Sequence, residues 1–208
     1  MASDARPLPD WLYVSRETAT KLRAFLDLVE KWNPRINLVS TNSLTSAWSR
    51  HVLDSAQLWE IARPVGGIWL DIGSGGGFPG VVIAILADEL APELRVMLVE
   101  SDRRKSVFLS EAARQLQLRA TVHCDRIETM APVGAHFISS RAFAVLAGLL
   151  PMVVRHGTEG CVALFPKGRR YQAELEICGQ KWVMQTEVLA SKTDPEGAIL
   201  KIQGVRHV

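Results

Sequence analysis

The segment that most constrains the fold of this chain is residues 69–85, WLDIGSGGGFPGVVIAI. A short apolar run meets an acidic residue, Asp71, passes through five glycines in the eight positions 73–80, and continues as an apolar stretch of helical character. A strand, a glycine-rich loop and a helix in this order place the loop at the carboxyl edge of a sheet, where open α/β sheets bind ligands. Such a loop can hold a dinucleotide, a phosphate group or S-adenosylmethionine.

Short apolar strands and helices alternate from residue 66 onward. The predicted strands are 68–72, 95–100, 120–123, 135–140 and 160–165, and the predicted helices between them are 79–88, 103–116 and 143–156. Nearly continuous apolar strands that alternate with helices indicate a parallel sheet covered on both faces. A helix at 171–177 then precedes strands 182–189 and 198–203, which the turn sequence TDPEG joins. We therefore expect an α/β fold whose mostly parallel sheet ends in an antiparallel edge pair.

Residues 1–65 are predicted to be a helical N-terminal extension, and residues 66–208 the main domain. A first helix carries apolar residues at helical spacing and should end at Asn33-Pro34. A second helix should start after Asn42 or Ser43 and stop before Pro64. The residues expected on one face of these two helices are Leu22, Phe25, Leu26, Val29 and Trp32, then Leu44, Trp48, Val52, Ser55 and Trp59. We expect the three tryptophans to serve packing rather than base stacking.

Composition restricts the class of protein. Hydrophobic residues make up 48% and charged residues 22% of the chain, as in a soluble globular protein. The net charge of +2 means that a polyanionic partner has to be met by local basic patches. Three scattered cysteines, Cys124, Cys161 and Cys178, favour a reducing compartment and no zinc site. With neither a signal-peptide pattern nor an apolar run of about 20 residues, we expect a cytoplasmic protein without a membrane segment or metal, and a monomer.

The glycine loop discriminates among its three possible ligands. A phosphate-binding P-loop needs a lysine in GxxxxGK[ST], and no lysine occurs between Lys31 and Lys105. The dinucleotide pattern GxGxxG fits Gly75, Gly77 and Gly80, but Pro79 has no N–H to offer a pyrophosphate and Phe78 adds bulk. S-adenosylmethionine has no phosphate, so it fits best.

The alternative register, Asp71-x-Gly73-x-Gly75-x-Gly77, resembles the first motif of class I S-adenosylmethionine-dependent methyltransferases. Glycines allow close approach of the backbone to the cofactor. Glu100, at the end of the next strand, is placed to accept hydrogen bonds from both ribose hydroxyls. The alternative is that the glycine-rich segment only reverses the chain and binds no ligand, but such a turn does not require an acid at the end of the next strand.

Further segments narrow the resemblance to one family. KWNPRINLVS (31–40), RHVLDS (50–55), DIGSGGGFPG (71–80), ESDRRKSVFL (100–109), DRIE (125–128), SRAF (140–143) and PKG (166–168) follow one another in this order. Together they closely resemble the bacterial small-subunit ribosomal RNA guanine-N7 methyltransferases, also known as glucose-inhibited division protein B. The resemblance implies a Rossmann-like class I methyltransferase fold and methylation of a guanine N7 in the decoding-region loop of 16S ribosomal RNA.

The resemblance also implies roles for individual residues. Gly73 and Phe78 would line S-adenosylmethionine, with Asp71, Gly75 and Gly77 shaping the loop, and Glu100 would hold the ribose. Ile127 and Glu128 would frame the adenine, and Arg141 would lie between cofactor and RNA. The sequence departs mildly from the family at Asp102, where an apolar or small residue is expected, and at Phe165-Pro166 before Lys167.

The chemistry of guanine N7 agrees with what the sequence contains. N7 has an in-plane lone pair and no proton at neutral pH, so it needs no general base. After the fourth predicted strand the sequence has SRAF rather than [DN]PP[YF], the motif of enzymes that methylate exocyclic amines. It also has no Pro-Cys pair, which would supply a nucleophile for attack on a pyrimidine carbon. Catalysis would then be positioning, with Arg141 as the candidate catalytic donor to guanine O6. A structural ion pair is the other interpretation of Arg141.

RNA binding requires basic groups near the same edge. The candidates for contact with 16S ribosomal RNA, as free RNA or within a small-subunit particle, are Arg50, His51, Arg103, Arg104, Lys105, Lys167 and Arg169. Solvated surface charge is an equal interpretation for each cluster, and His51 can be a packed histidine. Rival functions are a methyltransferase of small molecules or proteins, a nicotinamide-dependent oxidoreductase, and an RNA-binding module without activity.

Overall fold

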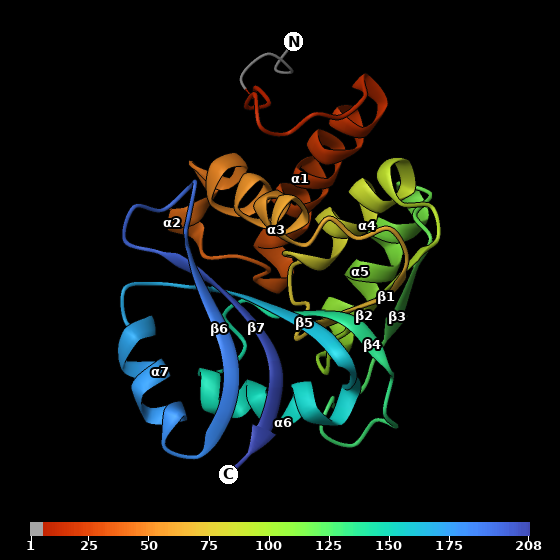
Figure 1. Cartoon of the computed structure of the whole chain (residues 1–208). Helices are drawn as coiled ribbons and strands as arrows, with labels where there is room; N and C mark the ends of the chain where they lie inside the picture. The colour runs from red at the N-terminus through yellow and green to blue at the C-terminus, as the bar shows by residue number, and fades with distance from the viewer. Residues whose placement is uncertain (1–5) are drawn as a thin grey trace.

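The computed structural model describes residues 6–208 as a twisted sheet of seven strands between two layers of helices (Figure 1). The strand order is β3-β2-β1-β4-β5-β7-β6. The strands are β1 (Gly67–Ile72), β2 (Leu94–Val99), β3 (Ala120–His123), β4 (Ala135–Ser139), β5 (Gly157–Lys167), β6 (Trp182–Ala190) and β7 (Ala198–His207). Neighbours from β3 to β5 pair in parallel, whereas β7 is antiparallel to both β5 and β6. The predicted α/β architecture with an antiparallel edge is confirmed.

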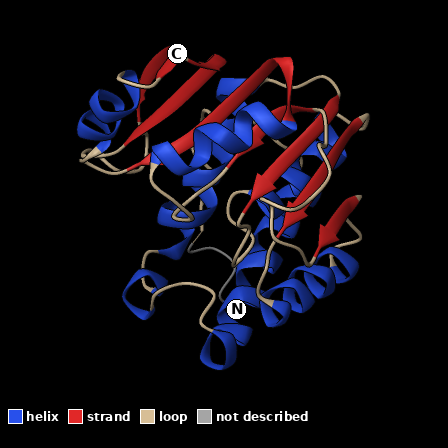
Figure 2. Cartoon of the chain, turned by 90° about the horizontal axis from the view of Figure 1, so that it is seen from below, coloured by secondary structure: helices blue, strands red, loops and turns tan. Residues whose placement is uncertain are grey.

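The helices cover both faces of the sheet (Figure 2). One face packs against α1 (Arg16–Ile36), α3 (Asp54–Ala62), α4 (Gly80–Leu90) and α5 (Arg103–Gln115), and the other against α6 (Leu146–His156) and α7 (Tyr171–Gly179). Side chains of a strand alternate between these two cores: Trp69 lies in the first, and its neighbour Leu70 in the second. Each such fully buried side chain contributes about 1.5–3 kcal/mol to folding.

The N-terminal helices belong to the first of these cores. Leu22, Phe25 and Val29 of α1 are buried in one cluster with Val81 of α4 and Leu98 of β2. The division predicted between residues 65 and 66 falls in the short connection between α3 and β1. Within residues 6–208, no helix is long and apolar enough to span a membrane.

The predicted end of the first helix is wrong. The first helix does not end at Asn33-Pro34 but continues to Ile36, and Asn37 closes it in the left-handed conformation (φ 49°). Asn33 explains the extension, because its backbone carbonyl accepts from Asn37 and its side-chain oxygen accepts the Val39 N–H at 2.8 Å. These bonds fold the chain back immediately after the helix.

The predicted second helix is interrupted. It comprises α2 (Thr41–Leu44), a π-helical turn η2 (Trp48–Leu53) and α3, which ends before Pro64 as predicted. π-Helical turns inside helical segments often occur at functional sites, and this one carries Arg50 and His51. The three tryptophans of the two predicted helices pack: Trp59 is buried, Trp32 lies on Phe108, and Trp48 donates to a backbone carbonyl.

Candidate active site

Several backbone N–H groups of the glycine loop after β1 donate to the end of β2. The N–H groups of Gly73 and Ser74 both donate to the Val99 carbonyl, at 2.9 and 3.0 Å, which attaches the loop to the end of β2. Gly73 has φ +67° and Gly77 has φ +88°, conformations that favour glycine. A Cβ on Gly77 would meet Val81 at 2.7 Å and the ring of Phe25 at 2.8 Å. The loop is therefore packed tightly against α1 and α4.

Asp71 holds the loop from inside the protein. It pairs in register with Ser139 on the adjacent parallel strand, so both side chains point to the same face. One carboxylate oxygen accepts from the Ser139 hydroxyl at 2.7 Å, and the other accepts the Gly80 N–H at 3.2 Å. Complete burial raises the pKa of Asp71 to about 6. Asp71 thus connects two strands to the start of α4 and is placed to shape the loop.

The start of α4 offers little to an anion. Pro79 has no N–H, the Gly80 N–H is used by Asp71, and the Val81 N–H donates to the Gly77 carbonyl at 2.8 Å. A pyrophosphate site depends on free donors at this position. The geometry therefore agrees with a ligand that carries no phosphate.

Glu100 lies beside the loop at the end of β2. One of its carboxylate oxygens accepts the Gly75 N–H and the other accepts the Asp102 N–H, both at 2.8 Å. A carboxylate has about four acceptor positions, so two hydroxyl donors can still be received. Asp102 caps α5 by accepting from the backbone N–H groups of Arg104 and Lys105.

The segment after β3 supplies an apolar wall. Ile127 is buried, and its carbonyl lies 2.9 Å from Nε2 of His156 on α6. Glu128 is exposed, and its carboxylate lies 3.7 Å from Nε of Arg126. Ile127 and Glu128, the glycine loop, and the Glu100 carboxylate for the ribose together fit S-adenosylmethionine. They would hold it at the ends of β1, β2 and β3.

A cleft of about 990 Å³ lies next to this loop. Its lining comes from segments that are far apart in the sequence: 38–43, 50–54, 140–145, 166–168 and 191–199, with Glu174. Four of the family-like motifs thus meet in one cavity, which the TDPEG turn between β6 and β7 completes. Phe143 lies between the cleft and the loop, because a Cβ on Gly73 would come 2.7 Å from its Cγ. The Phe143 ring occupies the space directly over Gly73, so a ligand that lies over this glycine requires the ring to move.

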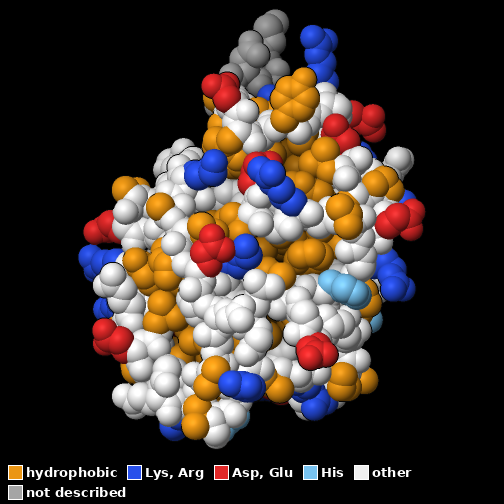
Figure 3. Space-filling model, in the orientation of Figure 1, with side chains coloured by type: hydrophobic (Ala, Val, Ile, Leu, Met, Phe, Trp, Pro, Cys, Tyr) orange, Lys and Arg blue, Asp and Glu red, His pale blue; other side chains and the backbone are white. Residues whose placement is uncertain are grey.

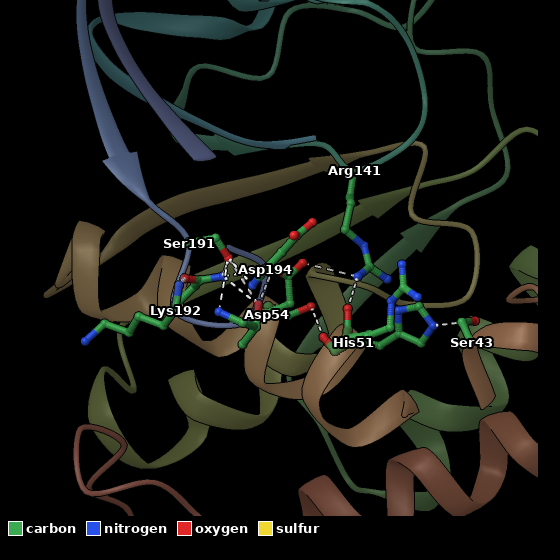
Figure 4. A network of polar contacts seen from close by, with 11 residues as sticks. Ser43, His51, Asp54, Arg141, Ser191, Lys192 and Asp194 are labelled. Atoms are coloured by element: carbon green, nitrogen blue, oxygen red, sulfur yellow. Dashed lines mark hydrogen bonds and ion pairs between the residues drawn. The ribbon is translucent and has the colours of Figure 1, made fainter. Parts of the chain in front are cut away.

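Arg141 reaches from the loop after β4 into this cleft (Figure 4). Its Nη1 donates to the Arg50 carbonyl at 2.9 Å and lies 3.3 Å from an Asp54 carboxylate oxygen. Its guanidinium carbon lies 5.2 Å from the ring centre of Phe78. The ring of Phe78 is itself buried against Phe25, so Phe78 supports the arginine. The ion pair expected as an alternative for Arg141 is present, and Arg141 lines the cleft as well.

His51 packs beside Arg141 (Figure 4). Its Nε2 lies 2.9 Å from the Ser43 hydroxyl, and its ring lies 5.1 Å from that of Phe78. Burial and the positive charge of Arg141 lower the pKa of His51 to about 4. The ring is therefore neutral at pH 7. It lines the cleft as a packed and uncharged group rather than as a cation.

We expect His51 to make the protein less stable in acid. Between pH 6.5 and 4 the unfolded histidine takes up a proton that the folded one refuses, so the free energy of unfolding falls as the pH falls. His51→Gln can keep the Ser43 contact and should weaken this fall. Urea unfolding at pH 7 and pH 4.5 measures the difference. His156, whose pKa is also lowered by burial, is present in both proteins and cancels. Equal losses in both proteins would contradict the assignment.

The predicted RNA-contacting cations lie in different settings. Lys167 is mostly buried, and its ammonium donates to Glu174 at 2.8 Å and to the Ala144 carbonyl at 3.1 Å, so it fixes the loop that carries Arg141. The exposed side chains are Arg50, Arg103, Arg104 and Arg169, and Lys105 is half-buried. On the face shown in Figure 3, basic, acidic and apolar side chains are interspersed.

Sequence reasoning missed several residues of the cleft. Asp54 lies within RHVLDS and Phe143 within SRAF, but neither was given a role there. Thr193 and Glu174 belong to segments interpreted only as a turn and a helix. One available signal was Asp54, an acid that follows Arg50 and His51 within the motif RHVLDS. Within residues 6–208, no three His, Cys, Asp or Glu side chains gather as a metal site would require.

Comparison with known proteins agrees with this geometry. Residues 18–198 match the family described as rRNA small subunit methyltransferase G. The ribosomal RNA small subunit methyltransferase G of Ruegeria pomeroyi is 48% identical over 202 residues, which covers 97% of this chain and 98% of the relative.

Solved structures with little sequence identity share the fold. A methyltransferase from Geobacter sulfurreducens superposes with a TM-score of 0.62 at 13% identity, covering 92% of each chain. A protein assigned as an S-adenosyl-L-methionine-dependent methyltransferase from Methanococcus maripaludis gives 0.58 at 12% identity, covering 92% of this chain and 95% of that one. The fold is that of these methyltransferases, and by sequence the chain belongs to the rRNA small subunit methyltransferase G family.

Proposed function

We propose that this protein transfers a methyl group from S-adenosylmethionine to N7 of a guanine in the decoding-region loop of 16S ribosomal RNA. The observation that carries the proposal is the cleft, where four motifs of the family meet next to a glycine loop in which the N–H groups of residues 73–75 and 77 already have hydrogen-bond acceptors. Relatives of 43–48% identity are named as ribosomal RNA small subunit methyltransferases, which supports an RNA substrate.

The residues of the site suit a reaction that needs no base. The bound cofactor supplies an electrophilic methyl group, and the guanine N7 lone pair can attack it without losing a proton. The chain then has to hold the base in line and exclude water, which is a proximity effect. Asp71 and Glu100 keep the loop in place. Arg141 is oriented to donate to guanine O6, where negative charge is concentrated.

The exposed cations are placed to meet the RNA backbone. Arg50 lines the cleft, and Arg103 and Arg104 begin α5 beside Glu100. Phosphate contacts of this kind position the substrate and weaken as salt rises. We propose that the enzyme acts as a monomer. We place it in the cytoplasm, where ribosomal subunits are assembled.

Mapping of 7-methylguanosine in 16S ribosomal RNA tests the proposal. Cells that lack the gene should lose one 7-methylguanosine in the decoding-region loop, and the unaltered gene should restore it. Complementation with Gly73→Asp should not restore it, whereas Gly160→Asp, on the exposed start of β5 where a Cβ meets nothing within 4 Å, should. An unchanged methylation pattern in the deleted strain would refute the proposed substrate.

A further inference from the structure

Asp54 joins three segments of the chain that are remote in sequence (Figure 4). It opens α3 and uses both carboxylate oxygens. Oδ2 lies 3.3 Å from Nη1 of Arg141, in the loop after β4. Oδ1 accepts from the Thr193 hydroxyl at 2.8 Å, in the turn between β6 and β7. Gln57, one turn along α3, donates to the same oxygen at 2.8 Å.

The turn between β6 and β7 is itself fixed on α3. The Gln57 side-chain oxygen accepts the Lys192 N–H at 2.9 Å, and the Gln57 amide nitrogen lies 3.2 Å from the Ser191 hydroxyl. Ser191 in turn accepts the backbone N–H of Asp194 at 3.2 Å. The turn therefore presents Thr193 to Asp54 in one orientation.

Arg141 is held from one side only. Its Nη1 makes both of its hydrogen bonds, to the Arg50 carbonyl and to Asp54. Among residues 6–208, Nε and Nη2 of Arg141 have no hydrogen-bond partner, although the side chain is only 17% exposed. A guanidinium has five donors in a rigid fork. Because Nη1 is anchored, the N–H groups on Nε and Nη2 remain available to a substrate that binds in the cleft.

Charge gives Asp54 a second effect on Arg141. Burial lowers the pKa of Arg141, and the Asp54 carboxylate opposes this shift. The guanidinium also lies near Arg50, whose charge acts against it. A half-buried cation without its partner is strongly disfavoured and turns toward water. Without the Asp54 carboxylate, Arg141 would therefore lose one of its two hydrogen bonds and the larger of the two negative charges that offset its burial, the other being Asp71.

We propose that Asp54 is a positioning residue for Arg141, and that the turn between β6 and β7 fixes Asp54 through Thr193. The inference rests on the proposed function, in which Arg141 acts on the guanine. It makes a turn near the C-terminus part of the catalytic machinery, although the turn is far in sequence from every motif of the family.

A double-mutant cycle tests the proposal with single-turnover methylation of small subunits from the deleted strain. Asp54→Asn should lower kcat about 10- to 100-fold, with S-adenosylhomocysteine affinity and KM for the subunit little changed. In an Arg141→Ala background, Asp54→Asn should have no further effect, because its effect passes through Arg141. Multiplicative losses in the double variant, or an unchanged kcat for Asp54→Asn, would overturn the proposal.

Thr193 provides a matched pair of controls. Thr193→Val removes the hydroxyl while Asp54 and Arg141 keep their ion pair, so kcat should fall only a few-fold, and Thr193→Ser should restore it. If Asp54→Asn does not fold, Thr193→Val combined with Gln57→Leu loosens the same carboxylate without removing it. This variant should then lower kcat in proteins with Arg141 but not in those with Arg141→Ala, and an equal loss in both would overturn the proposal.

A readout without turnover separates this inference from the proposed function. The side-chain Nε–H signal of Arg141, assigned by its disappearance in Arg141→Ala, should report a rigid group in the unaltered protein and a mobile one in Asp54→Asn by ¹⁵N relaxation. Equal mobility in both would overturn the positioning role even if the enzyme methylates guanine. Loss of rigidity together with no detectable 7-methylguanosine would instead reject the proposed function and leave the positioning of Arg141 supported.

Discussion

Gly73→Asp is expected to abolish binding of S-adenosylhomocysteine, with an affinity loss of about 100-fold or more, measured by isothermal titration calorimetry. Gly73 has φ +67°, a conformation that costs a side-chain-bearing residue about 1–2 kcal/mol. Its Cβ would also meet the ring of Phe143, so the loop or the ring has to shift. The new carboxylate would lie on the surface proposed to receive the cofactor and would displace it.

The same substitution at Gly160 controls for the added charge and for handling of the protein. Gly160 is exposed in β5, and a Cβ there meets no atom within 4 Å. Gly160→Asp should therefore bind S-adenosylhomocysteine like the unaltered protein. Circular dichroism and thermal unfolding establish whether Gly73→Asp is folded. A folded Gly73→Asp protein with unaltered affinity would show that the cofactor does not lie over this glycine.

The order and type of the strands follow from local signals in the sequence. The third strand was predicted at 120–123 and is observed at Ala120–His123, because glycines, prolines and charged residues mark the ends of short apolar runs. The antiparallel edge was indicated by the TDPEG turn, and β6 and β7 do form an antiparallel pair. In both cases the residues that decide the structure lie within a few positions of the strand or turn that they define.

Helix boundaries failed where distant contacts decide them. The helix predicted from 143 begins at Leu146, whose N–H donates to Glu174 of α7 at 2.6 Å. Glu174 also holds Lys167, so one carboxylate sets the end of the loop after β4. Residues 140–145 are thereby kept out of the helix and line the cleft. No pattern within 140–156 contains Glu174, so local periodicity could not have found this boundary.

The same distinction applies to the site. The residues around the glycine loop were accessible from sequence because a loop between adjacent elements is a local motif. The partners of Arg141 were not, because Asp54 precedes it by 87 residues and Thr193, which supports Asp54, lies 139 residues beyond Asp54. Motif order predicted that Arg141 lies near the cofactor. Only the folded structure shows that hydrogen bonds connect Arg141 to Asp54 in the N-terminal part and, through Asp54, to Thr193 in the turn between β6 and β7.

Arg141→Ala is expected to lower kcat for 16S ribosomal RNA by about 100-fold, the effect of misplacing a base that has to be held in line with the methyl group. S-adenosylhomocysteine affinity should fall much less than kcat, because both hydrogen bonds of the guanidinium go to Arg50 and Asp54 and only its contact with the Phe78 ring reaches the glycine loop. The fold should be retained, since Asp54 keeps its hydrogen bonds from Thr193 and Gln57. Single-turnover kinetics with calorimetry and thermal unfolding measure the three quantities.

Arg23→Ala is the matched control for this prediction. Arg23 also donates to a backbone carbonyl, that of Arg6, and lies 6.0 Å from the ring centre of Trp48, but it does not line the cleft. Its removal therefore costs a hydrogen bond to a backbone carbonyl and a contact with an aromatic ring, though no ion pair, without touching the proposed site, and kcat should stay within a few-fold of the unaltered enzyme. If the two variants lose activity equally, and in proportion to their loss of stability, Arg141 is a structural ion pair. A rate loss confined to Arg141→Ala requires a group that acts on the substrate.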